Sequence, residues 1–128
     1  KLRIYNDSAA TIPDAVLEAV KSFDGPLLLI TGGTDKNLDF THYREIAEYP
    51  EIVVLLEGTG TKKIEEALQD AGKEYLGPYS SLEEAVETAV KQARPGDTVL
   101  FSPGCASFGM FLNEFDRGNR FRDLISAL

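Results

Sequence analysis

The amino-acid sequence predicts an α/β fold: a Rossmann-like, three-layer domain with a mostly parallel sheet of about five strands flanked by helices. Apolar runs of strand length alternate along the chain with segments whose apolar residues recur every three or four positions. Residues 27–30 and 52–56 are apolar without a break, which is typical of parallel strands covered on both faces. With 128 residues, 43% of them hydrophobic, the chain is long enough for one domain with its own core.

The first half of the chain starts with a short strand over residues 3–5. A helix over residues 13–23 follows, because proline suits a first helical turn and the apolar residues then keep helical spacing. Residues 26–31 form the second strand. Residues 41–49 read as a helix that stops before Pro50, because a proline disfavours helical geometry in the residue before it.

The third strand covers residues 52–56, and Thr61 is expected to cap a helix over residues 61–71 that Gly72 ends. A short fourth strand over residues 74–76 is expected near an edge of the sheet. A serine at position 80 or 81 can cap the next helix, which runs to residue 94. The remaining two elements are a strand over residues 98–101 and a helix over 108–128, broken around Gly118.

This alternation implies a parallel sheet with right-handed crossovers. Ligands bind such sheets at the carboxyl ends of the strands, where three polar or glycine-rich loops lie: residues 6–11, 32–39 and 102–107. In the last loop, Gly104, Ala106 and Ser107 are expected to leave room for a ligand close to the main chain. A helix starting there would favour an anion, because its first N–H groups are unpaired.

The charge balance excludes several partners. The chain has 21 acidic and 13 basic residues and a net charge of −8, so we expect no binding to nucleic acid or to an anionic membrane. The single cysteine cannot form an internal disulfide and fits a reducing compartment. We expect no catalytic pair of Cys105 and His42, because they lie in different elements. No metal site is expected, because the acidic residues follow solvated helix faces.

Three motifs carry a resemblance. They are DSAAT at residues 7–11, GGTDKNLDF at residues 32–40, and SPGCAS at residues 102–107 followed by Phe111, Asn113 and Arg117-Gly118. In this order and spacing they resemble the C-terminal domain of the Mur ligases, in particular the type that adds D-glutamate to UDP-N-acetylmuramoyl-L-alanine in peptidoglycan biosynthesis.

The resemblance implies a cytoplasmic ligase of three domains that serves cell-wall biogenesis, cell shape and division. The first domain binds the UDP-sugar substrate, and the second binds ATP and Mg²⁺ with a P-loop. This chain has no Gly-x-x-x-x-Gly-Lys-Ser/Thr motif. We therefore expect residues 1–128 to be a single domain, the amino-acid-binding one, with the UDP-binding and ATPase domains absent. Such a fragment should be monomeric, bind no cofactor by itself and be inactive alone.

The resemblance also implies roles for individual residues, none of them catalytic. Asp7 matches an acid that approaches the ribose of ATP. The D-glutamate contacts match Thr11, Lys36, Ser107, Phe108 and Glu114, the last through its backbone N–H. Lys36 would pair with a carboxylate of the substrate in a charge-assisted contact.

The chain departs from the family pattern at three positions: Ala9 replaces a lysine, Ile12 an asparagine and Glu114 a phenylalanine. An extra acid at position 114 would weaken binding of an anionic substrate unless it points away. Simpler interpretations of the motif residues also stand: Lys36 as a solvated lysine, Asp7 as a turn cap and Ser107 as a helix N-cap.

Two further alternatives concern a loop and the chain as a whole. Residues 58–61 (GTGT) invite a phosphate-binding interpretation, but they lack the full glycine fingerprint and are better explained as a turn plus a helix cap. For the whole chain, the alternatives are a stand-alone Rossmann-like anion-binding module and an engineered folding scaffold, neither with enzymatic activity.

Overall fold

The structure, a computed structural model, describes residues 2–107 and 110–128. The described part of the chain forms one five-stranded sheet in the order β1-β5-β2-β3-β4, and every neighbouring pair of strands is parallel. The strands are β1 (Arg3–Asn6), β2 (Leu27–Thr31), β3 (Ile52–Leu56), β4 (Leu76–Tyr79) and β5 (Thr98–Phe101). The predicted α/β architecture is confirmed, and so is the edge position of the fourth strand.

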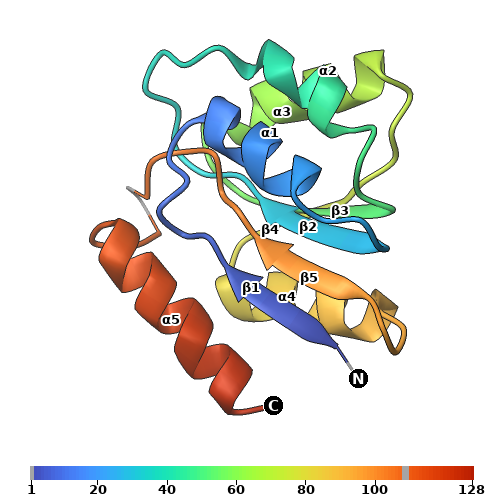
Figure 1. Cartoon of the computed structure of the whole chain (residues 1–128). Helices are drawn as coiled ribbons and strands as arrows, with labels where there is room; N and C mark the ends of the chain where they lie inside the picture. The colour runs from blue at the N-terminus through green and yellow to red at the C-terminus, as the bar shows by residue number, and fades with distance from the viewer. Residues whose placement is uncertain (1, 108–109) are drawn as a thin grey trace.

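Helices cover both faces of the sheet, which makes three layers (Figure 1). One face carries α1 (Pro13–Lys21), the 3₁₀ turn η1 (Phe40–His42), α2 (Tyr43–Ile46) and α3 (Thr61–Asp70). The opposite face carries α4 (Leu82–Gln92) and α5 (Glu114–Ser126), and α5 lies beneath β1. Because every neighbouring pair of strands is parallel, the carboxyl ends of all five strands lie at one rim of the sheet.

Strand β2 shows how the sequence divides the core in two. Successive side chains of a strand point to opposite faces of a sheet. Leu27 and Leu29 accordingly pack into the cluster under α1, α2 and α3, whereas Leu28 and Ile30 pack into the cluster over α4 and α5. All five residues of β2 are buried, as the unbroken apolar run predicted.

The two predicted helix N-caps have different outcomes. Ser81 caps α4 as predicted, because its hydroxyl accepts a hydrogen bond from the N–H of Glu84 at 3.1 Å. The predicted cap by Thr61 is wrong: Gly60 occupies the N-cap position of α3. The Thr61 hydroxyl instead donates to the carbonyl of Leu56 and accepts from the N–H of Gly33. It joins the end of β3 to the loop after β2.

Three elements differ from the predicted ranges. The helix predicted over residues 41–49 is the short pair η1 and α2. The fourth strand, predicted over residues 74–76, is β4, which runs two to three residues further along the chain and contains a cis Gly77–Pro78 bond. The last helix begins at Glu114 rather than at residue 108, and it continues through Gly118 without a break.

Candidate functional site

Three loops leave the carboxyl ends of three adjacent strands. Loop 1 (residues 7–12) follows β1, loop 2 (residues 32–39) follows β2, and loop 3 (residues 102–107 and 110–113, as described) follows β5, which lies between the other two strands. Backbone hydrogen bonds join loop 3 to both neighbours. The N–H of Gly104 donates to Ala10 in loop 1 at 2.8 Å, and Thr34 and Ala106 exchange two bonds at 3.0 and 3.1 Å.

The loops enclose a cavity of about 270 Å³. Its lining residues are Thr11 and Ile12 of loop 1, Lys36 and Leu38 of loop 2, Ala106 and Ser107 of loop 3, and Glu114 at the start of α5. Ser107 is buried, whereas Lys36 is exposed. The cavity therefore offers hydroxyl groups, one ammonium group and one carboxylate within an otherwise apolar wall.

The structure brings together four of the five residues that the family resemblance assigned to D-glutamate: Thr11, Lys36, Ser107 and Glu114 all line this cavity. The fifth, Phe108, lies outside the described residues. Glu114 is the first residue of α5, so the cavity also meets the N-terminal end of a 13-residue helix.

Asp7 does not line the cavity, although it belongs to the same rim. Its carboxylate accepts a hydrogen bond from the hydroxyl of Ser102 at 2.8 Å, which links the ends of β1 and β5. Partial burial raises the pKa of Asp7 above its ordinary value of 3.8, and the hydrogen bond from Ser102 lowers it by a smaller amount. The alternative interpretation of Asp7 as a turn cap holds only for its backbone, because the carbonyl of Asp7 accepts a hydrogen bond from the N–H of Ala10.

The structure contradicts one alternative interpretation and one expectation for loop 3. Ser107 is not a helix N-cap, because α5 begins seven residues later and Asn113 caps it by accepting from the N–H of Asp116 at 2.8 Å. Gly104 does not leave room for a ligand. A side chain at Gly104 would instead meet the hydroxyl of Tyr43 and a methyl group of Val16, and both of these residues are fully buried in the core.

Arg117 is the residue of this region whose role sequence reasoning missed. It lies in α5 and is 1% exposed. Its guanidinium donates to the hydroxyl of Ser8 at 3.1 Å, to the carbonyl of Ser8 at 2.7 Å and to the carbonyl of Cys105 at 2.9 Å. Burial lowers its pKa from 12.5 to about 10. The helical spacing gave a signal, because Arg117 falls one turn before the buried Phe121 on the inward face of α5.

Cys105 and His42 are far from forming a catalytic pair. Cys105 is fully buried, and burial raises the pKa of its thiol to about 12. A thiol is a nucleophile only as its thiolate. His42 lies in η1 and faces Asp14 at 3.6 Å, with its side chain 37% exposed.

The glycine-rich segment before α3 does not cradle a phosphate. A side chain at Gly58 would collide with the backbone of Gly33, and one at Gly60 would press on Phe40, Gly33 and Cys105. The N–H of Gly60 donates to Gly33 at 2.9 Å, and that of Thr61 donates to Gly58 at 3.1 Å. These glycines allow close packing on loop 2, and this segment does not fit the phosphates of ATP.

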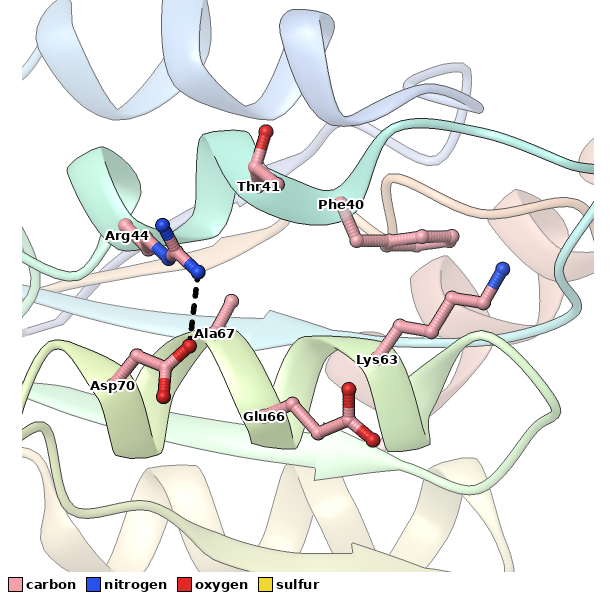
Figure 2. A pocket seen from close by; sticks show the side chains of 7 residues that line it. All are labelled: Phe40, Thr41, Arg44, Lys63, Glu66, Ala67 and Asp70. Atoms are coloured by element: carbon pink, nitrogen blue, oxygen red, sulfur yellow. Dashed lines mark hydrogen bonds and ion pairs between the residues drawn. The ribbon is translucent and has the colours of Figure 1, made fainter.

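A second hollow, of about 230 Å³, lies between η1, α2 and α3 (Figure 2). Arg44 and Asp70 point toward each other across it and form an ion pair at 3.0 Å. Lys63 approaches the ring of Phe40 at 5.8 Å and pairs with Asp35 at 2.6 Å. Both cations of this hollow, Arg44 and Lys63, are therefore already paired with carboxylates.

The part of the chain that the structure describes has neither a metal-ligand cluster nor a membrane-spanning helix. Within residues 2–107 and 110–128, no three His, Cys, Asp or Glu side chains cluster as metal ligands would. None of the helices in that part of the chain is both long and apolar enough to cross a membrane.

Comparison with known proteins identifies relatives along almost the whole chain. UDP-N-acetylmuramoylalanine–D-glutamate ligase of Roseiflexus sp. (strain RS-1) is 49% identical over 98% of this chain and 28% of its own length. The proteins of the same name from Borreliella burgdorferi (strain ZS7) and Treponema pallidum (strain Nichols) are 45% and 40% identical over 97% and 99% of the chain. The chain spans 28% and 24% of those two relatives.

A solved structure has the same fold. It is a domain from Haemophilus ducreyi 35000HP, described as part of a UDP-N-acetylmuramate:L-alanyl-γ-D-glutamyl-diaminopimelate ligase. It aligns with a TM-score of 0.64 over 98% of this chain and 90% of the domain, at 16% identity. The family model described as "Mur ligase, glutamate ligase domain" matches residues 1–105. On this match, which covers most of the sequence, and on the ligase relatives, the chain belongs to the glutamate ligase domain family of the Mur ligases.

Proposed function

We propose that this chain is the amino-acid-binding domain of an ATP-dependent ligase that adds D-glutamate to UDP-N-acetylmuramoyl-L-alanine, and that loops 1 to 3 hold the incoming D-glutamate. Residues 1–128 act in this proposal as a single domain. The other parts of such a ligase bind the UDP-linked substrate, ATP and Mg²⁺, and the reaction takes place in the cytoplasm. The relatives' shared name supports this reaction, and they are about three and a half to four times as long as the chain.

One observation carries the proposal: Thr11, Lys36 and Ser107, from three different loops, line one cavity. The ammonium group of Lys36 and the two hydroxyl groups suit the carboxylates of an amino acid, since charge-assisted hydrogen bonds are the stronger ones. The cavity volume of about 270 Å³ lies just below the roughly 300–1,000 Å³ of pockets for drug-sized ligands, which fits a smaller guest.

The domain contributes to catalysis by orientation. Amide formation needs the amine of D-glutamate to reach an activated carboxyl group, and fixing one reactant lowers the barrier by several kcal/mol. Asp7 lies outside the cavity but on the same rim, and its resemblance to a ribose-binding acid makes it the candidate contact to the nucleotide. Because this chain has no P-loop motif, the proposal assigns the residues that hold the triphosphate to another part of the ligase.

Titration of the ¹⁵N-labelled chain with D-glutamate tests the proposal. We expect amide shifts to gather at Lys36, Ser107 and Glu114 with D-glutamate and to be weaker with L-glutamate. Lys36→Gln should weaken binding about 10- to 150-fold, the effect of losing a charged hydrogen bond of about 1.5–3 kcal/mol.

Lys62→Gln is the matched control, because Lys62 is an exposed lysine of α3 outside the cavity. Shifts that avoid the three loops, or equal losses in both variants, would contradict the proposal. The chain alone should catalyse no ATP-dependent ligation, and turnover by it would also contradict the assignment.

A further inference from the structure

Arg117 is a buried cation with neutral partners. Its three hydrogen bonds go to one hydroxyl group and two carbonyl groups. In the described part of the chain, no carboxylate lies within ion-pair distance of its guanidinium. Burying a charge costs free energy, and an apolar residue of similar volume often stabilises a core as well or better. Stability alone therefore does not account for an arginine at this position.

The partners of Arg117 belong to two neighbouring loops that both line the cavity. Ser8 lies three residues before Thr11 in loop 1, and Cys105 lies two residues before Ser107 in loop 3. The hydroxyl of Ser8 also donates to the carbonyl of Glu114 at 3.0 Å, so the same group reaches the start of α5. The planar guanidinium fixes the directions of its donors, which makes the distance between its acceptors hard to change.

Loop 2 is also connected to this network, through the residue that follows Cys105. Ala106, the residue after Cys105, exchanges two backbone hydrogen bonds with Thr34, which lies two residues before Lys36. A displacement of Cys105 would therefore reach loop 2 through this bridge. Arg117 therefore contacts loops 1 and 3 directly, and Ser8 contacts the start of α5. Loop 2 is joined to loop 3 by the two bonds between Thr34 and Ala106.

We propose that Arg117 is a positioning residue for the amino-acid cavity: by holding Ser8 and Cys105 together it sets the distance between Thr11 and Ser107 before the ligand arrives. The identity of the ligand rests on the function proposed above, whereas the ordering of the loops does not. Arg117 touches no ligand in this role, and its effect passes through the backbones of loops 1 and 3.

The test compares Arg117→Lys with Arg122→Lys in the 128-residue chain. Arg122 lies on the same helix, but it is exposed and does not line the cavity. Amide hydrogen exchange and D-glutamate titration are measured by NMR on both variants. Lysine keeps the charge at position 117 but lacks the fork of donors, so the comparison separates charge from geometry.

We expect Arg117→Lys to speed exchange at the amides of Gly104, Ala106 and Thr34 about tenfold, the effect of losing about 1.4 kcal/mol locally, while amides of β2 and β3 are unchanged. The dissociation constant for D-glutamate should rise by a similar factor. Arg122→Lys should change neither quantity. A residue with only a structural role would instead speed exchange throughout the core.

The inference is overturned if Arg117→Lys leaves loop exchange and affinity unchanged, or if loop and core amides lose protection equally. Should Arg117→Lys not fold, Ser8→Ala decides the question, since it removes one acceptor and the link to Glu114 but keeps the carbonyl of Ser8. It should give a smaller change at the same amides, and no change would refute the role. If the unaltered chain does not respond to D-glutamate, the proposed function fails, while loop exchange still decides the role of Arg117.

Discussion

Replacement of Gly104 by alanine tests the core contact beneath loop 3. Gly104 has a φ of +68°, where an L residue costs about 1–2 kcal/mol. A methyl group there would lie 2.7 Å from Cγ2 of Val16 and would also meet the hydroxyl of Tyr43. Neither neighbour has room to move, since both are fully buried, so overpacking adds about 1–3 kcal/mol. We expect a total loss of about 2–5 kcal/mol, a large part of the 5–15 kcal/mol of a typical domain.

Gly72 provides a matched control for the backbone term. Its φ of +71° is close to that of Gly104, but a methyl group there would find no atom within 4 Å. Gly72→Ala should therefore cost only the backbone term of about 1–2 kcal/mol. Urea unfolding followed by circular dichroism measures both losses, provided that the m-values stay equal.

A double variant identifies the colliding atom. Tyr43→Phe alone should cost about 1 kcal/mol, because the hydroxyl of Tyr43 hydrogen-bonds to that of Thr31 at 2.6 Å. In the Gly104→Ala background the same change should cost less or restore stability, since it removes the nearest obstacle. Equal losses at Gly104 and Gly72, or strictly additive effects in the double variant, would refute the reasoning.

Three other predictions concern the loop rim. The folding stability of the Asp7→Asn variant, relative to that of the unaltered chain, should increase as the pH rises from about 4 to 7. The raised pKa of Asp7 means that the folded state binds the proton more tightly, so the contribution of Asp7 to stability falls as pH rises through that pKa; urea midpoints with a constant difference would contradict this. Glu114→Gln should tighten D-glutamate binding about two- to fivefold in calorimetric titration, because like charges repel by about 1 kcal/mol at 4 Å even in bulk water, and weaker binding would count against it. Cys105, with a thiol pKa of about 12, should react with a thiol reagent at pH 8 only after unfolding, and rapid labelling of the native chain would show that the thiol is accessible.

Buried apolar runs made the central strands predictable from sequence. The ranges of β3 and β5 match the predicted residues 52–56 and 98–101, because every residue in these runs is apolar or β-branched and packs into the sheet. The location of β4 was less predictable. Its sequence, LGPY, contains two residues that disfavour strands, and only its pairing with β3 makes it a strand.

Loop 3 shows why part of the site was beyond sequence reasoning. Its small residues resembled the start of a helix, but tertiary hydrogen bonds to Ala10, Thr34 and Arg117 hold the segment as a loop, and α5 starts at Glu114. The meeting of Thr11, Lys36 and Ser107 followed from the rule that parallel strands end at one rim. Helical spacing placed Arg117 on the inward face of α5, but its three acceptors could not be predicted, because no local pattern specifies carbonyl and hydroxyl groups from distant loops.

The alternation along β2 makes the two halves of the hydrophobic interior mechanically inseparable. Leu28 and Leu29 are consecutive in the chain but belong to different clusters, so neither helical layer can detach without withdrawing a strand from the other. The molecule should therefore melt as one cooperative unit with a single calorimetric transition. A small molecule that binds only at the end of this strand would then raise the melting temperature of both helical layers together.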